Sequence, residues 1–114
     1  ASAFLSALIV SGLRTDRFVF EGFLPLKKGR KTKLESLRSE RRTIVFYESP
    51  HRVIKTLNEI HATWGERNVV VARELTKKFE EIIRGPISVI LKQLSSKTTR
   101  GEYVVLVEGS PLDN

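Results

Sequence analysis

The chain contains neither cysteine nor methionine among its 114 residues. Without cysteine it can form no disulfide and use no thiolate, which fits a reducing compartment, so we expect a cytoplasmic protein. With two histidines and no cysteine, the usual ligand sets of a zinc site are missing, and we expect no metal. No apolar run approaches the ~18 residues that span a bilayer. The apolar start of the chain lacks the basic residues and cleavage site of a secretory signal.

The sequence has the features of a piece cut from a longer protein. It lacks methionine and begins in the middle of a helix-like pattern over residues 1–11. Removal of the first methionine from a small protein would explain the first of these features, but not the second. The length suits one domain. We place this domain at residues 1–109, followed by a disordered tail at 110–114.

The net charge of +7 predicts an anionic partner, of which nucleic acid is the commonest. The most basic run covers residues 27–33, where five of seven residues are cations. The run is either a phosphate-contacting loop that leads into a helix or a solvated surface loop, and mutual repulsion of its cations favours the first reading. Arg41 and Arg42 extend the basic surface. The cations of this run that we expect to bind phosphate are Lys27, Lys28, Arg30 and Lys31.

Short apolar and β-branched runs alternate with helical patterns along the chain, which indicates an α/β fold. We expect a two-layer or three-layer domain with a mixed, mostly parallel sheet of about five strands and about four helices. The expected strands are 17–24, 43–47, 68–72, 79–84 and 102–108. The expected helices are 1–11, 34–40, 50–64 and 87–94, the third of them capped by Ser49 and Pro50.

Charged clusters follow two of the expected strands, 43–47 and 68–72. A strand-helix-strand crossover makes a parallel pair, whose carboxyl ends meet at one edge of the sheet, about 5 Å apart if the strands are adjacent. Ligands bind at such edges in open α/β sheets. The candidates for acid-base catalysis at this edge are Glu48, His51 and Glu74.

These groups also have ordinary structural interpretations. The carboxylates are either general bases or members of an ion network with Arg52, Arg73 and Lys77. His51 is either an active-site residue or a partly exposed residue at the start of a helix. Thr76 is either a hydrogen-bond donor to a ligand or a turn residue. The motifs GxGxxG, P-loop and HExxH are all missing from the sequence.

An ordered set of motifs makes the chain resemble a known family. The set resembles the C-terminal half of the small-subunit ribosomal RNA methyltransferases of type I, a group within the tetrapyrrole-methylase (class III) methyltransferases. The resemblance covers nearly all of residues 3–109. The motifs that carry it are Ser11–Leu13, Phe20–Pro25, Phe46–Arg52, Arg73–Lys77, Glu80–Glu81 and Arg84–Gly85.

The resemblance implies a two-domain and usually dimeric enzyme that uses S-adenosylmethionine to methylate the ribose 2′-hydroxyl of a cytidine in small-subunit (16S) rRNA. The cofactor would lie in a cleft between this domain and an N-terminal domain with a glycine-rich loop. That loop is missing here, so we expect this chain to be inactive alone. The implied cofactor contacts are Glu48, Val70, Val71 and Ala72. The expected RNA contacts are Lys27, Lys28, Arg30, Lys31, Arg52, Arg73, Thr76 and Lys77.

Two other functions compete with this interpretation. One is a related methyltransferase that acts on a tetrapyrrole, against which the basic run and the His51–Arg52 pair argue. The other is a stand-alone RNA-binding module, which would need aromatic stacking platforms or a known RNA-binding motif, and neither is evident.

Overall fold

The computed structural model describes residues 17–75, 78–94 and 101–111. Several expectations fall outside these ranges: the helix at 1–11, Thr76 and Lys77, the loop at 95–100 and the last residues of the tail. The described elements are β1 (Phe18–Phe23), α2 (Arg30–Leu37), β2 (Thr43–Glu48), α3 (Val53–Trp64), β3 (Asn68–Leu75), β4 (Lys78–Pro86), α4 (Ile87–Leu94) and β5 (Glu102–Val107).

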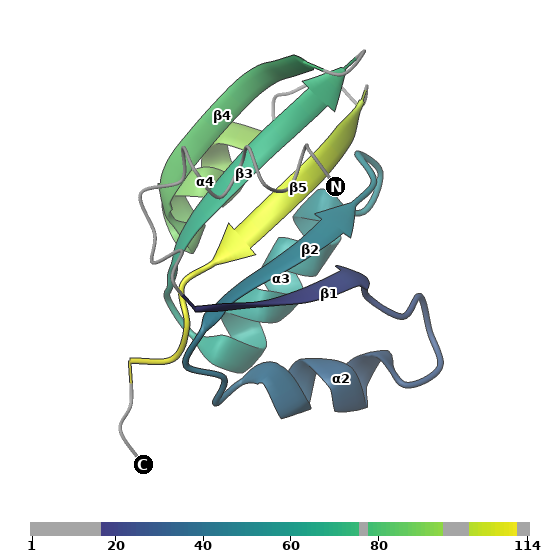
Figure 1. Ribbon diagram of the computed structural model, residues 1–114, viewed down its shortest axis with the longest axis vertical. Coiled ribbons are helices and arrows are strands. Elements are labelled where there is room, and N and C mark those ends of the chain that lie inside the picture. Colours follow the sequence, from purple (N-terminus) through teal and green to yellow (C-terminus); the bar gives the residue numbers. More distant parts are fainter. Residues whose placement is uncertain (1–16, 76–77, 95–100, 112–114) are drawn as a thin grey trace.

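The strands form one five-stranded mixed sheet in the order β1-β2-β5-β3-β4 (Figure 1). The expected five-stranded α/β domain is confirmed. The expectation of a mostly parallel sheet is wrong, because in the described residues β1 and β2 are the only parallel neighbours and the other three pairings are antiparallel. The physical reason is that β4 folds back on β3 as a hairpin, while β5 returns between β2 and β3 and runs against both of them.

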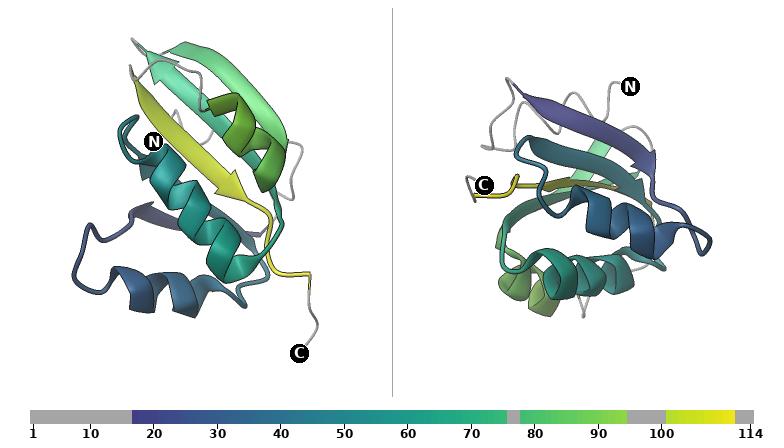
Figure 2. Two further views of the ribbon diagram at one scale, coloured as in Figure 1. Left: turned by 180° about the vertical axis from the view of Figure 1, so that it is seen from behind. Right: turned by 90° about the horizontal axis from the view of Figure 1, so that it is seen from below.

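All three described helices lie on the same face of the sheet (Figure 2). The main core fills the space between the two layers and takes its side chains from α2, α3, α4 and alternate sheet positions, such as Ile44 and Phe46 of β2. The intervening positions, such as Val45, form a second cluster on the other face, made of strand residues alone. Strand alternation therefore assigns each residue of the sheet to a face.

The helices agree with the sequence patterns except at their starts and ends. The buried stripe of α4 is Ile87, Ile90 and Leu94, as the sequence predicts. The expected N-cap at Ser49 is wrong, because α3 begins at Val53. The carbonyl of Ser49 instead accepts hydrogen bonds from the backbone N–H groups of Arg52 and Val53, which closes a turn before the helix.

Three strands, β2, β3 and β4, are longer than expected, whereas β1 and β5 are slightly shorter. β3 continues past Ala72 to Leu75, so Arg73 and Glu74 lie inside the strand and not after it. The β3–β4 hairpin, which begins at Lys78, explains this extension, because each strand supplies hydrogen bonds to the other. In β1 the pairing with β2 shifts between Phe20 and Gly22, and Gly22 takes the positive φ of 66° that this bulge requires.

The chain after β5 stays in contact with the domain. Gly109 and Ser110 are buried, and the N–H of Ser110 donates to the carbonyl of Glu40 at 2.6 Å. Of the expected tail at 110–114 the structure describes residues 110 and 111, and this hydrogen bond holds Ser110 against the domain.

Trp64 links α3 to the end of α2. Its indole N–H donates to the carbonyl of Leu34 at 2.7 Å, and this carbonyl is one of those that the end of a short helix leaves without a helical partner. Both residues are buried. The bond therefore satisfies a polar group that water does not reach.

We expect Trp64→Phe to lower the free energy of unfolding by about 1–3 kcal/mol, because the aromatic body stays while the Leu34 carbonyl loses its buried donor. Urea unfolding of the purified protein measures this change. Asn58→Ala, on the exposed side of the same helix, is the control and should change stability by less than about 0.5 kcal/mol. Equal unfolding midpoints for Trp64→Phe and the wild type would show that this bond is not needed.

Candidate functional site

The carboxyl ends of β2 and β3 lie at the same edge of the sheet, which we call the rim. Pairing through β5 puts Glu48 opposite Tyr103 and Tyr103 opposite Arg73, so these three residues form a row across three strands. The expectation of a shared edge is confirmed. The spacing of about 5 Å applied only to adjacent strands, and β5 separates these two, which are therefore about 10 Å apart.

Glu48 is buried and both of its carboxylate oxygens are engaged. One accepts from the backbone N–H of Ser49 at 2.9 Å, and the other accepts from the Thr56 hydroxyl at 2.6 Å. Its exposed fraction is 4%. A carboxylate held in this way anchors the turn after β2 to α3, and its geometry is that of a structural group more than of a general base in contact with a substrate.

Arg30 completes a buried polar network with Glu48. Its guanidinium donates to the Thr56 hydroxyl at 2.7 Å, to the Glu59 carboxylate at 2.6 Å and to the carbonyl of Pro25 at 2.8 Å. Only 6% of Arg30 is exposed. Its expected role as an RNA contact is therefore corrected: this cation is turned inward because a carboxylate of α3 neutralises it.

The other expected phosphate ligands of the basic run lie on the surface. Lys27, Lys28 and Lys31 are all exposed. They flank Arg30 on both sides in the sequence, so the buried guanidinium holds the loop while its neighbours face solvent. Lys33 forms a salt bridge of 2.7 Å with Glu21, which ties α2 to β1.

Among the residues that the structure describes, two arginines at the rim have a buried nitrogen for which no hydrogen-bond partner is found. The Nε of Arg52 is one, although another nitrogen of its guanidinium lies 3.4 Å from the carbonyl of Leu26. The Nε of Arg73 is the other, and it lies 3.6 Å from the Glu81 carboxylate. Buried donors that lack an acceptor are uncommon in folded proteins and often mark functional sites. Both of these lie at the edge where ligands were expected.

The other two expected catalytic residues do not form a hydrogen-bonded group with Glu48. His51 is exposed in the turn before α3. Glu74 is opposite Glu102 on β5 and follows a shift in the β3–β4 register. Neither has a hydrogen bond to Glu48, both of whose oxygens have the partners described above. Thr76 and Lys77 lie outside the described residues.

The expected cofactor contacts from β3 do not offer side-chain atoms to a ligand. Val70, Val71 and Ala72 are at most 1% exposed, and their strand pairs with a neighbour on each side. Val71 belongs to the main core, and the other two belong to the second cluster. In the part of the chain that the structure describes, no group of three acidic or histidine residues could hold a metal ion. No helix in that part is long and apolar enough to cross a membrane.

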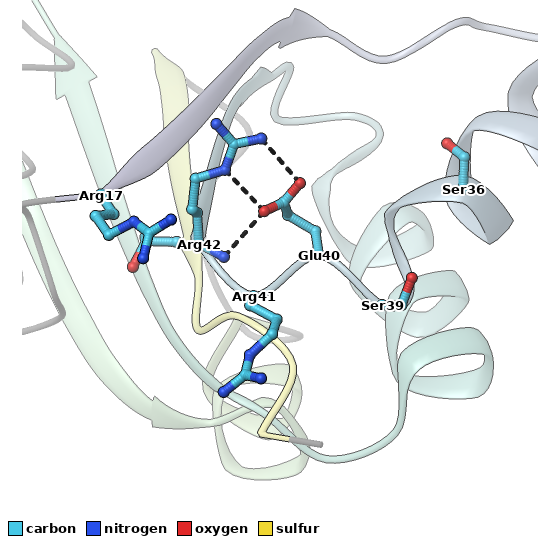
Figure 3. Close-up of a pocket in the computed structure, with 7 residues that line it drawn as sticks. Arg17, Ser36, Ser39, Glu40, Arg41 and Arg42 are labelled. Carbon is cyan, nitrogen blue, oxygen red and sulfur yellow. Dashed lines mark hydrogen bonds and ion pairs between the residues drawn. The ribbon is translucent and has the colours of Figure 1, made fainter. Parts of the chain in front are cut away.

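The opposite edge of the sheet carries a basic groove that the sequence did not reveal as a unit. The groove has a volume of about 620 Å³ and lies where β1 and β2 begin (Figure 3). Its lining residues are Arg17, Ser36, Ser39, Glu40, Arg41, Arg42 and Thr43. The Arg41–Arg42 pair is visible in the sequence as a basic extension, but Arg17 reaches it only through the pairing of β1 with β2.

Glu40 and Arg42 form an ion pair inside this groove. The Arg42 guanidinium donates to the Glu40 carboxylate at 2.8 and 3.1 Å, and the Arg42 backbone N–H donates to it at 3.0 Å. These hydrogen bonds lower the pKa of Glu40 from 4.5 to about 2. The same pair raises the pKa of Arg42.

The geometry of the site does not identify a protein family, whereas comparison with known proteins does. Residues 1–90 match the family described as Tetrapyrrole (Corrin/Porphyrin) Methylases. The chain belongs to the tetrapyrrole methylase family. Its fold agrees with this, since it superposes on a cobalamin biosynthetic enzyme, cobalt precorrin-4 methyltransferase, with a TM-score of 0.64 over 94% of this chain and 47% of that one. At 19% identity, that likeness concerns the fold alone.

Several curated members of the family have much higher identity to the chain. Proteins named ribosomal RNA small subunit methyltransferase I are 48% identical in Haemophilus influenzae and 47% identical in Bacillus subtilis, over 97% and 96% of this chain. The corresponding protein of Thermotoga maritima is 44% identical over 95% of the chain. The chain spans 41%, 38% and 49% of the lengths of these relatives, in that order. It is therefore homologous to part of a methyltransferase of this kind.

Arg30→Met should lower the free energy of unfolding by about 2–4 kcal/mol, because it leaves Glu59 and the Thr56–Glu48 pair without their cation. We place the cost below that of a fully buried pair because the Glu59 side chain is 33% exposed. Chemical denaturation measures it, with Lys31→Met on the adjacent exposed position as the matched control. If both variants unfold like the wild type, Arg30 does not organise this region.

Glu40→Gln should reduce the dependence of stability on acid pH. A carboxyl whose pKa falls from 4.5 to about 2 on folding contributes stability that is present above about pH 4.5 and is lost as pH falls toward 2. Thermal unfolding between these pH values should show a shallower decline for the variant than for the wild type. Parallel curves would mean that the Glu40–Arg42 pair is not formed in solution.

Proposed function

We propose that this chain is the C-terminal part of an S-adenosylmethionine-dependent methyltransferase that methylates the ribose 2′-hydroxyl of a cytidine in small-subunit rRNA. The observation that carries the proposal is the identity of 44–48% with rRNA small subunit methyltransferases over at least 95% of the chain. A tetrapyrrole substrate has weaker support, because the solved precorrin enzyme is only 19% identical. A stand-alone RNA-binding module does not account for the family.

In this proposal the rim forms one wall of the cleft between two domains of a longer protein that acts as a dimer in the cytoplasm. Arg52 and Arg73 are half-buried cations at this edge, and their positive charge suits an anionic group such as an RNA phosphate. His51 is exposed in the turn next to Arg52 and is the best placed of the three candidate bases. Glu48 has a positioning role through the turn that follows it.

Methyl transfer to a hydroxyl is mainly a positioning task, because the oxygen must approach the methyl group in line with the leaving sulfur. The bound cofactor would supply the methyl group. Glu48 and the β3 residues Val70–Ala72 do not fit the cofactor as side-chain ligands, since their side chains are buried or engaged. We therefore propose that other groups hold the cofactor, and we assign no step of the reaction to these residues.

The exposed lysines of the basic run hold the RNA in this proposal. Lys27 and Lys28 lie in the loop before α2 and Lys31 lies in the first turn of α2, and Arg30 bonds this segment to α3, so their positions are set by the fold. Such contacts neutralise backbone phosphates and do not read sequence. They supply affinity that depends on salt, while the rim selects the reacting ribose.

The test of the reaction is methyl transfer from labelled S-adenosylmethionine to small ribosomal subunits by the full-length protein. The expected product is a 2′-O-methylcytidine in the rRNA, identified after nuclease digestion by mass spectrometry. A base-methylated nucleotide, or a methylated tetrapyrrole in place of RNA, would contradict the proposal.

The double variant Lys27→Glu and Lys28→Glu should weaken binding to the rRNA and lower the slope of log affinity against log salt by about two, close to one for each lost phosphate contact. Filter binding at several salt concentrations measures the slope. The control is Lys55→Glu with Arg84→Glu, which makes the same charge change at exposed positions on α3 and β4. An equal loss of RNA affinity in both double variants would mean that only the net charge of the protein matters.

A further inference from the structure

Two phenylalanines of one short stretch are exposed although the backbone around them is held in place. Phe20 is 43% exposed and Phe23 is 61% exposed. The next residue, Leu24, is buried in the main core, and the carbonyl of Pro25 accepts a hydrogen bond of 2.8 Å from Arg30. Neighbouring exposed apolar side chains, unlike scattered ones, mark interaction sites.

A β-bulge places both phenylalanines on the same face of the sheet. Side chains alternate between the two faces of a regular strand, so residues three apart lie on opposite faces. The bulge adds one residue to β1 between Phe20 and Gly22. Phe20 is therefore opposite Val45, and Phe23 is opposite Tyr47. Val45 and Tyr47 belong to the cluster on the face away from the three described helices, so both phenylalanines lie on that face too.

Tyr47 contacts both phenylalanines. The centroid of its ring is 5.3 Å from that of Phe20, with the two planes at 77°, and 5.5 Å from that of Phe23, with the planes at 53°. Aromatic rings prefer such edge-to-face and tilted arrangements, which restrict their orientation. Phe23, the most exposed of the three, is thus a solvent-facing ring supported by a half-buried one.

These three residues, which we call the aromatic platform, border the rim. β1 and β2 are parallel, so their carboxyl ends lie at the same edge of the sheet (Figure 1). Phe23 is the last residue of β1, and Tyr47 directly precedes Glu48, the last residue of β2. Adjacent strands are about 4.8 Å apart. A ligand on the platform therefore lies next to a ligand at the rim.

The surroundings of the platform are basic. The two lysines at 27–28 follow it in the chain and are exposed. The Arg52 guanidinium donates to the carbonyl of Leu26 at 3.4 Å, which brings a further cation to the loop after β1. Glu21, the acidic residue of this stretch, is paired with Lys33 at 2.7 Å. Aromatic rings beside cations are the combination that binds single-stranded nucleic acid, since the bases stack while the cations follow the backbone.

The size of the platform suits a base better than a protein partner. An aromatic side chain has a surface of about 150–250 Å², and less than two thirds of each of these three is exposed. A standard protein interface buries roughly 800 Å² on each partner, which is well above what the platform offers. One exposed ring is enough to stack one base.

We propose that the aromatic platform stacks an unpaired base of the substrate RNA, with Phe23 as the ring in contact. The proposal rests on the proposed function, since it takes the ligand to be small-subunit rRNA. Tyr47 and Phe20 fix the orientation of the contacting ring. Every base has a π face, so the platform holds the RNA beside the rim and does not read its sequence.

The experiment compares two substitutions of Phe23 in the full-length protein, with naked small-subunit rRNA as the probe. Phe23→Leu keeps an apolar side chain but has no π face, and we expect it to bind the rRNA about tenfold more weakly than the wild type. Phe23→Trp enlarges the π face and should bind at least as tightly as the wild type. Filter binding measures the affinities.

Two further readouts separate stacking from charge and from folding. The slope of log affinity against log salt should be the same in both variants and in the wild type, because no phosphate contact is lost. In the methyl-transfer assay, KM for rRNA should rise about tenfold for Phe23→Leu. Both variants should keep the wild-type unfolding midpoint, since most of the side chain at this position is exposed.

The control is Val89→Ala, which removes exposed apolar surface away from the rim. Val89 is 44% exposed and lies in the first turn of α4. This helix follows Pro86, which pairs with Asn68 at the start of β3, whereas the rim lies at the carboxyl ends of β2 and β3. The control should bind rRNA as the wild type does.

Three outcomes would overturn the platform. One is equal rRNA affinity of Phe23→Leu and the control. A second is weaker binding of S-adenosylmethionine by Phe23→Leu, measured by calorimetry, with unchanged rRNA affinity, which would identify the adenine of the cofactor as the stacked base. A third is a changed unfolding midpoint or oligomeric mass in both Phe23 variants, which would identify a contact between protein surfaces.

The two proposals fail in different ways. If the full-length protein transfers no methyl group to rRNA, the proposed function is wrong, and the binding comparison still decides whether the platform takes a base. If methyl transfer occurs while Phe23→Leu and the control bind rRNA alike, the proposed function stands and the platform is not an RNA site.

Discussion

The buried ion pair of Arg30 is the interaction on which the structure around the rim depends. Its guanidinium bridges the Glu59 carboxylate and the Thr56 hydroxyl of α3, and Thr56 in turn donates to Glu48 at the end of β2. A cation removed from water is stable only when it is paired and fully hydrogen-bonded. The basic run, the helix and the last residue of the strand therefore hold one another in place, and the turn with His51 and Arg52 follows from that arrangement.

Local patterns in the sequence were enough to find most of the elements. The apolar runs of β2 and β5 and the buried stripe of α4 each depend on residues that are near one another in the chain. The helix start at Val53 was not found in this way, because Glu48 is held by Thr56 and, through Thr56, by Arg30, and the chain makes a turn at Ser49 before the helix begins. The place of β5 between β2 and β3 is a non-local property as well, and it changed both the sheet directions and the spacing at the rim.

At the candidate site, the burial of side chains also depends on contacts that local sequence patterns do not reveal. Arg30 and Lys31 are neighbours of the same charge, yet one is buried and the other is exposed. The signal that separates them is Thr56, a hydroxyl on the otherwise apolar face of α3, because a buried polar group needs a partner. Conversely, Arg17 and Arg41 are far apart in sequence and share a groove only because β1 and β2 are parallel and begin together.

The position of β5 also has a consequence for how the polypeptide acquires its shape. The strands that flank it, β2 and β3, are both made before it, and they have no hydrogen bonds to each other. During synthesis, one edge of the β1–β2 unit and one edge of the β3–β4 hairpin therefore stay unpaired until residues 102–107 emerge from the ribosome and pair with both. Assembly of the sheet is thus a late event that depends on contacts distant in sequence, which is the kind of topology that folds slowly and exposes strand edges on the way.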